Sequence, residues 1–233
     1  MIKKHIPNFI TLLNLFCGCI AIVCLSEANY HLAFYFASLG IILDFFDGFF
    51  ARVLNAYSPL GLQLDSLADM VTSGVAPGYM SFLILQNYTT NEYVPFLGFL
   101  VTLGAAYRLA KFNISTNQSE HFIGLPVPAN TLLVMGFCLI IVKNSILPLN
   151  HLYFILGLVF FSTIMQNVNL PLFSLKIKSL SPFAYPFQFV LIFIAGLGLA
   201  FYQLTAIPFV IVLYIFLSLI KHILYANQKK INP

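Results

Sequence analysis

Residues 44–69 read DFFDGFFARVLNAYSPLGLQLDSLAD and combine strong apolarity with an unusual set of charges. Four of the seven acidic residues of the chain lie in this stretch, in two segments that are otherwise apolar: Asp44, Asp47, Asp65 and Asp69. A charged residue at the centre of a membrane-spanning helix costs roughly 2.5–3.5 kcal/mol on insertion scales. Four carboxylates in such segments therefore indicate a functional site.

The composition of the whole chain supports this interpretation. Of its 233 residues, 60% are apolar or aromatic and only 8% are charged. Soluble domains are roughly 45–50% apolar and about 25% charged, and disordered or nucleic-acid-binding chains need still more charge. The sequence therefore excludes nucleic acid as a partner. It predicts an all-α, polytopic membrane helix bundle whose surroundings are a lipid bilayer.

A membrane-spanning helix needs about 20 mostly apolar residues. Turn and breaker residues divide this chain into eight such segments, at 8–26, 31–54, 61–86, 94–112, 128–144, 149–167, 183–202 and 205–225. The first is interpreted as a retained helix because no clear signal-peptide cleavage site follows it. For residues 168–182, an interfacial position stays open as an alternative to crossing. We expect one domain covering 1–233.

The basic residues give the orientation. If the N-terminus is cytoplasmic and every segment crosses once, ten of the eleven basic residues fall on the cytoplasmic side and only Lys143 falls outside. This agrees with the positive-inside rule. We therefore expect a multi-pass protein of the cell (inner) membrane with both termini cytoplasmic. The ten residues are Lys3, Lys4, Arg52, Arg108, Lys111, Lys176, Lys178, Lys221, Lys229 and Lys230.

The spacing of the four aspartates predicts that they converge. Asp44 and Asp47 are three residues apart on one helix, and Asp65 and Asp69 are four apart on the next, so each pair shares a helix face. The short connection at 55–60 makes the two helices antiparallel neighbours. Carboxylates this close stay ionised together only around a highly charged cation. Oxygen ligands favour Mg²⁺ or Mn²⁺, and two ions are expected; Ca²⁺ usually requires more ligands.

Small residues and one arginine accompany the aspartates. Gly48, Ala51 and Gly61 leave room for a ligand to approach the backbone, and Arg52 lies one turn after Gly48, where it can clamp a phosphate. Metal ions beside an arginine describe a site for a phosphodiester or diphosphate. The simpler alternative is that these are helix-packing residues and an inside-facing arginine.

The pattern Asp-x2-Asp-Gly-x2-Ala-Arg-x8-Gly-x3-Asp-x3-Asp over residues 44–69 resembles the signature of the CDP-alcohol phosphatidyltransferase family at every defined position. The resemblance implies six core helices, a homodimer, a two-metal site and an active site open to the cytoplasmic leaflet. Members of this family transfer a phosphatidyl-type group from a CDP-linked donor to an alcohol and release CMP.

Further segments resemble the membrane-bound, serine-using class of this family, and together the similar segments form a motif core over 7–130. They are Pro7-Asn8-x2-Thr11-x2-Asn14-x3-Gly18, the hexapeptide RLAKFN at 108–113 and the octapeptide FIGLPVPA at 122–129. This chain differs from the usual pattern at Lys111 and Asn130. The resemblance implies CDP-diacylglycerol as donor and L-serine as acceptor. The C-terminal helices, 149–225, contain only apolar helix patterns.

The resemblance also implies roles for individual residues. Asp69 would be the general base, and the four aspartates would hold metal. The nucleotide would contact Gly48, Ala51, Arg52 and Gly61, together with Thr11 and Asn14, for which hydrogen bonding between helices is an equal alternative. The acceptor carboxylate would meet Arg108, Lys111 and Asn113, whose alternative roles are inside-facing charge and lipid headgroup binding.

Two competing functions stay open. Another family member would use a different acceptor: glycerol 3-phosphate, phosphatidylglycerol or an inositol phosphate. A cation or proton transporter would also place carboxylates in a membrane. The transporter is disfavoured because no acidic residue follows Glu120, so nothing in the last helices continues an ion path across the bilayer.

Overall fold

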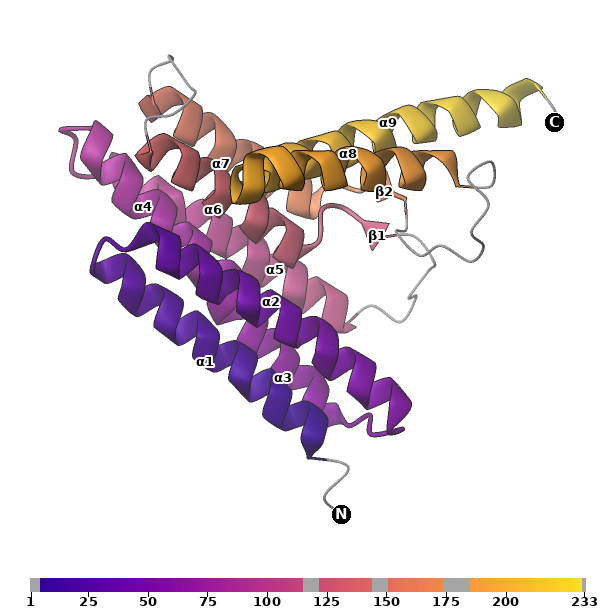
Figure 1. Cartoon of the computed structure of the whole chain (residues 1–233), viewed down its shortest axis with the longest axis horizontal. Helices are drawn as coiled ribbons and strands as arrows, with labels where there is room; N and C mark the ends of the chain where they lie inside the picture. Colours follow the sequence, from indigo (N-terminus) through magenta and orange to yellow (C-terminus); the bar gives the residue numbers. More distant parts are fainter. Residues whose placement is uncertain (1–4, 115–121, 144–150, 174–184, 232–233) are drawn as a thin grey trace.

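The computed structural model describes residues 5–114, 122–143, 151–173 and 185–231, and within these ranges each of the eight predicted segments corresponds to helix (Figure 1). The helices are α1 (Ile6–Ser26), α2 (Tyr30–Val53), α3 (Pro59–Asp69), η2 (Met70–Val75), α4 (Ala76–Tyr88), η3 (Val94–Phe99), α5 (Leu100–Ile114), α6 (Val127–Val142), α7 (His151–Asn167), α8 (Pro186–Tyr202), η4 (Gln203–Ala206) and α9 (Ile207–Ile231). Two-residue strands, β1 (Phe122–Ile123) and β2 (Pro171–Leu172), pair antiparallel. The all-α bundle is thereby confirmed.

Several predictions fall on residues outside these ranges. Lys3 and Lys4, most of the segment 168–182 with Lys176 and Lys178, and the first residues of the predicted helices at 149 and 183 are among them. The side chains of 225–231 are likewise outside the description.

Four helical stretches of the described chain are long and apolar enough to cross a membrane: α1, α2, the η3–α5 unit over Val94–Ile114, and the α8–α9 pair over Pro186–Leu224. α6 and α7 are apolar but shorter. Large apolar side chains on the outside of the bundle fit a lipid environment; Phe16 is 62% exposed and Phe193 is 68% exposed. The chain is therefore a membrane protein.

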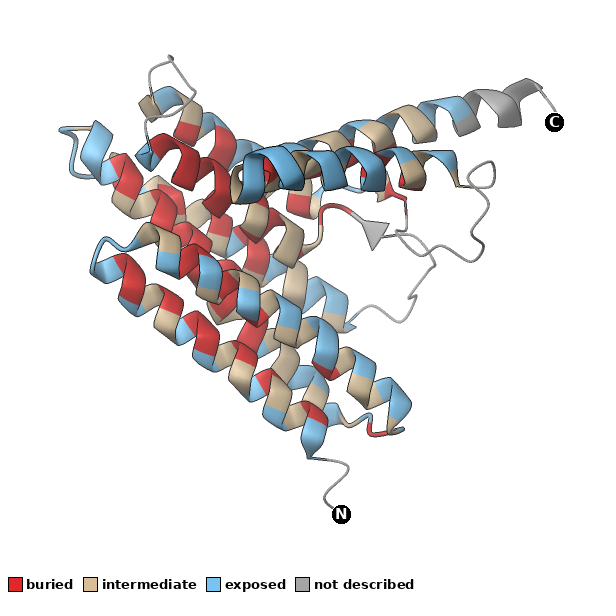
Figure 2. Ribbon diagram, in the orientation of Figure 1, coloured by how far each residue is buried: buried red, intermediate tan, exposed pale blue. Residues whose placement is uncertain are grey.

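α6 is the central helix of the bundle. Twelve of its sixteen residues are buried, and it is apolar around its whole circumference, as expected for a helix without a solvent or lipid face. Met135 and Cys138 pack into the core formed with α1, α2, α4 and α7, whereas Leu133 and Phe137 pack toward α8 and α9. α8, in contrast, is mostly exposed (Figure 2).

α1, α2 and η2 interlock at one threonine. Thr72 is fully buried, and its hydroxyl donates a hydrogen bond to the carbonyl oxygen of Asn14 at 3.0 Å. A Cβ on Gly18 would lie 2.4 Å from the Thr72 hydroxyl oxygen, and a Cβ on Gly40 would lie 2.7 Å from the Thr72 methyl carbon. Only glycines therefore permit this approach of three helices.

The predicted third span, 61–86, is one continuous helical stretch whose middle turn, η2, is a π-helix. Pro77 explains this turn because it has no N–H to donate to the carbonyl of Ser73. Hydroxyl groups of other helices donate hydrogen bonds to the backbone carbonyls of η2. Thr131 donates to the carbonyl of Ser73 at 2.8 Å, and Thr102 donates to that of Gly74 at 2.9 Å. π-turns of this kind often occur at functional sites, and this one begins directly after Asp69.

Candidate active site

The turn between α2 and α3 brings the aspartates together. Asn55 has a φ of +49°, a left-handed conformation that Asn tolerates better than most residues. Ser58 then caps α3, its hydroxyl accepting the Gly61 N–H at 3.0 Å, and Pro59 occupies the first helical position. α3 therefore begins immediately and runs antiparallel to α2, as the sequence predicted.

Three of the four predicted carboxylates form one group. Oxygen atoms of Asp44 and Asp47, from α2, and of Asp65, from α3, all lie within 4.8 Å of one another. The group does not include Asp69, which follows Asp65 by one helical turn. Three hard anionic oxygen donors at this separation fit a divalent cation that bridges them. The residues present could thus hold a metal ion.

Asp47 is held by α1. Its side chain is only 6% exposed, and the Thr11 hydroxyl lies 2.6 Å from one of its carboxylate oxygens. The same hydroxyl is 3.0 Å from the carbonyl oxygen of Pro7. A hydroxyl that donates to a carboxylate forms a short, charge-assisted bond. Thr11 therefore orients a carboxylate of the acidic group.

Asp69 is also held by α1, one turn deeper. It is 7% exposed, and the Nδ2 of Asn14 donates to one of its oxygens at 3.3 Å. Thr11 and Asn14, three residues apart, therefore each hydrogen-bond an aspartate of a neighbouring helix. This is the helix-to-helix alternative left open by the sequence.

The small residues near the aspartates have different surroundings. A Cβ added to Gly48 would have no heavy atom within 4 Å, so packing within this chain does not explain that glycine. A Cβ on Gly61, in contrast, would lie 3.0 Å from the Asn8 side-chain oxygen of α1, so Gly61 has a packing role. Open space beside Gly48 adjoins the acidic group.

Arg52 and Ala51 lie in the last turn of α2. Arg52 is exposed, and its Nε donates to the carbonyl oxygen of Gly48 at 3.0 Å. The carbonyl oxygen of Ala51 accepts the amide of Ala56 where the helix ends. A guanidinium is therefore anchored to the backbone of Gly48, the residue that follows Asp47.

The predicted acceptor residues separate in the structure. Asn113 contacts α3: its side chain and that of Ser66 exchange hydrogen bonds at 2.9 and 3.1 Å, beside Asp65. Lys111 is exposed. The Arg108 guanidinium turns instead to backbone carbonyls, donating to Gln166 and, at 3.3 Å, to Gly124.

Several polar residues near the site were not predicted from the sequence. Ser66 lies between the motif positions, and Thr72 lies one turn beyond them, so both look like ordinary helix residues. Gln166 is fully buried and meets Arg108 through its backbone carbonyl. The available signal was the polarity of these residues within apolar spans, since polar groups there usually have a partner.

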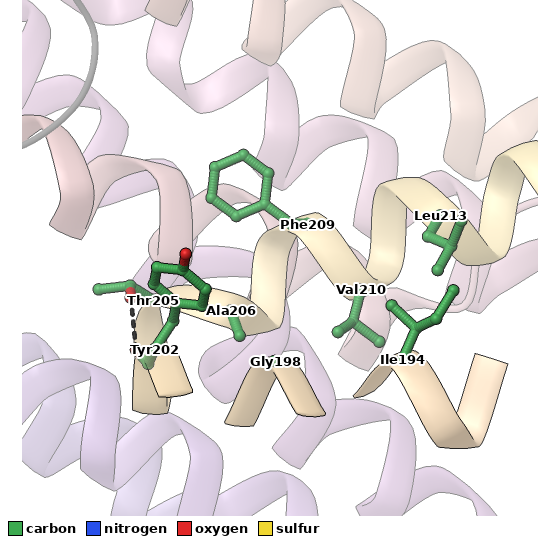
Figure 3. A pocket seen from close by; sticks show the side chains of 8 residues that line it. All are labelled: Ile194, Gly198, Tyr202, Thr205, Ala206, Phe209, Val210 and Leu213. Carbon is green, nitrogen blue, oxygen red and sulfur yellow. Dashed lines mark hydrogen bonds between the residues drawn. The ribbon is translucent and has the colours of Figure 1, made fainter. Parts of the chain in front are cut away.

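A cavity of about 320 Å³ lies elsewhere, between α8, η4 and α9 (Figure 3). No charged side chain lines it, and none of its lining residues comes from the helices that carry the aspartates. It has no donor set for a metal or a phosphate. The lining residues are Ile194, Gly198, Tyr202, Thr205, Ala206, Phe209, Val210 and Leu213.

Several characterised proteins are similar to this chain. A CDP-diacylglycerol–serine O-phosphatidyltransferase of Bacillus subtilis (strain 168) is 42% identical over 150 residues, which cover 63% of this chain and 79% of the relative. Proteins with the same name from Saccharomyces cerevisiae and Methanocaldococcus jannaschii are 40% and 38% identical. The alignments cover 63% and 68% of this chain, and 58% and 72% of those relatives.

The family comparison agrees with the geometry of the site. The model of the family described as CDP-alcohol phosphatidyltransferase matches residues 4–169, a range that contains every predicted site residue. The sequence signature and the three-carboxylate group both lie in α2 and α3, and the matched range, which extends over α1 to α7, contains them. The chain belongs to the CDP-alcohol phosphatidyltransferase family.

Proposed function

We propose that this protein transfers a phosphatidyl group from CDP-diacylglycerol to the hydroxyl of L-serine, giving phosphatidylserine and CMP. The observation that carries the proposal is the group formed by Asp44, Asp47 and Asp65, with Asp69 one turn deeper. The names of the relatives support serine as acceptor. In this reaction the serine oxygen bonds to the lipid-side phosphorus, the bond from that phosphorus to the oxygen of CMP breaks, and the serine proton passes to a base.

Metal binding is assigned to Asp44, Asp47, Asp65 and Asp69, with Mg²⁺ or Mn²⁺ as the ion and two ions in the complete site. Such ions, when bound, neutralise the diphosphate and stabilise the CMP leaving group. The contribution of the chain is to hold the carboxylates in position. Thr11 supports this role for Asp47 through its 2.6 Å contact.

Asp69 is the proposed general base. It is the aspartate farthest along α3 from the α2–α3 turn, and it is buried, so the serine hydroxyl would reach it in a site from which bulk water is displaced. Geometry has priority over pKa in naming a base. Its hydrogen bond from Asn14 fixes the direction in which its second oxygen points.

The nucleotide part of the donor would lie along the outer edge of α2 and the start of α3. Gly48 offers open space there, and Arg52 offers a positive charge for a phosphate. Ala51 and Gly61 are the other small residues proposed to contact the nucleotide. Thr11 and Asn14 would line the same region from α1, although their contacts with the aspartates support a positioning role first.

The acceptor would approach from α5. Arg108, Lys111 and Asn113 are proposed to receive its carboxylate, and the contact between Asn113 and Ser66 supports a position beside Asp65.

We also propose that the protein crosses the inner membrane several times, with both termini and the active site cytoplasmic, and works as a homodimer.

The acceptor is tested with purified protein in detergent micelles containing CDP-diacylglycerol and Mg²⁺. CMP release is measured with serine, glycerol 3-phosphate or inositol added separately. We expect release to depend on serine and the lipid product to carry its ammonium group. Release with glycerol 3-phosphate alone would instead identify another member of the family.

A further inference from the structure

Of the buried side-chain polar atoms that lack a hydrogen-bond partner among the described residues, five belong to three residues about one helical turn below the site. They are the Ser73 hydroxyl oxygen and both side-chain amide atoms of Asn130 and of Gln166. All three residues are 0% exposed. A buried polar group without a partner is destabilising, and more so in a bundle surrounded by lipid, so groups of this kind normally have a ligand or ordered water.

These residues occupy one level of the bundle, where four helices meet. Thr131 donates to the carbonyl of Ser73 at 2.8 Å, which joins α6 to η2. Asn167 donates to the carbonyl of Gly104 at 3.2 Å, which joins α7 to α5. We call this level the amide layer, and its members are Ser73 and Gly74, Gly104 and Ala105, Asn130 and Thr131, and Gln166 and Asn167.

Two close approaches complete the amide layer. The Gln166 Nε2 lies 3.5 Å from the position that a Cβ on Gly104 would take, and the Ala105 Cβ lies 3.4 Å from the corresponding position at Gly74. α5 therefore contacts η2 on one side and α7 on the other through residues with little or no side chain.

The amide layer lies directly below the proposed reaction site. Ser73 follows Asp69 by four residues along α3 and η2, and Arg108 follows Gly104 by four residues along α5. One turn of helix therefore separates the layer from a carboxylate on one helix and from a guanidinium on another. Arg108 also donates to the backbone of Gln166 itself.

We infer that the amide layer completes the acceptor site: its side-chain amides bind the ammonium group and share the carboxylate with the adjacent Arg108, while the acceptor hydroxyl stays at Asp69. This inference rests on the proposed transfer to serine. A side-chain amide has an oxygen that accepts from an ammonium and an NH₂ that donates to a carboxylate, so Asn130 and Gln166 suit both ends of a zwitterion. A phosphate dianion would need cations at this level, and the layer offers neutral groups.

The test removes the hydrogen-bonding groups and keeps the volume, in Asn130→Leu and Gln166→Met. We expect the KM for serine to rise about tenfold or more in each variant, because a site that binds polar groups loses its selective contacts. The KM for CDP-diacylglycerol should stay within about twofold. Gln188→Met, in α8, removes a buried amide outside the layer and should leave both constants unchanged.

The outcomes separate this inference from the proposed function. The inference alone would be overturned if both variants release CMP with an unchanged KM for serine and unfold at a higher temperature than the wild type. Release from the wild type with glycerol 3-phosphate but not with serine would overturn the proposed function and this inference with it.

If both variants fail to fold, the wild-type protein decides. Unlabelled serine should then inhibit the incorporation of labelled serine about tenfold better than ethanolamine, which lacks the carboxylate. It should also inhibit better than 3-hydroxypropionate, which lacks the ammonium. Equal competition by the three compounds would overturn the inference.

Discussion

Asn14 of α1 donates a hydrogen bond to the buried carboxylate of Asp69, 55 positions later in the chain, across 3.3 Å. Its backbone carbonyl in turn accepts the hydroxyl of Thr72. The first helix is therefore part of the candidate site, and its contribution can be measured separately from that of the signature in α2 and α3.

Asn14→Leu should lower kcat by about 10- to 100-fold, the usual effect of losing a residue that orients a ligand or base. The KM for CDP-diacylglycerol should change little, because the substitution acts through Asp69. A raised donor KM with an unchanged kcat would assign Asn14 to the nucleotide instead. Asn91→Ala, in an exposed loop, is the control and should change neither constant.

Asp69→Asn should abolish turnover while donor binding largely survives, because an amide cannot take the serine proton. Turnover is followed as CMP release, and donor binding as the protection of the protein against thermal unfolding by CDP-diacylglycerol. Activity equal to that of the wild type would refute the role of Asp69 as base.

Removal of divalent metal should abolish activity, and adding Mg²⁺ or Mn²⁺ should restore it. Asp44→Ala should need at least about tenfold more metal for half-maximal rate, because one of three grouped carboxylates is lost. Glu92→Ala, in an exposed loop, should keep the wild-type metal requirement. An enzyme that is fully active after thorough chelation would contradict the assignment of the aspartates.

Gly48→Ala should raise the KM for CDP-diacylglycerol without harming the fold. The added methyl group meets no protein atom, and alanine within a helix is more stable than glycine by about 0.5–1 kcal/mol. The matched control is Gly157→Ala in α7, where a Cβ also has nothing within 4 Å. Identical donor KM values in the two variants would remove Gly48 from the nucleotide site.

The helices were largely predictable because the length of an apolar run sets the length of a membrane helix. The predicted span 31–54 corresponds to α2, and 61–86 corresponds to the continuous stretch from α3 to α4. The π-turn at η2 was not predictable from local sequence. It depends on Pro77 together with hydroxyls from α5 and α6 that reach its carbonyls.

The site was predictable as a meeting of aspartates but not in its detailed arrangement. Asp69 follows Asp65 by four residues, a rise of about 6 Å along the helix, so it lies deeper than the group that Asp65 joins. The position of Arg108 was not predictable either, since its carbonyl partners come from the connection between β1 and α6 and from the end of α7. Such contacts between distant segments leave no periodic signal.

The interlock of Thr72 between Gly18 and Gly40 limits how the enzyme can move. Sliding or twisting α1 against α2 would drive side-chain atoms into backbone that is already in contact. A lateral opening that admits a two-tailed lipid from the bilayer must then form between other helices. The α1–α2–η2 unit would stay rigid and keep the aspartates in position.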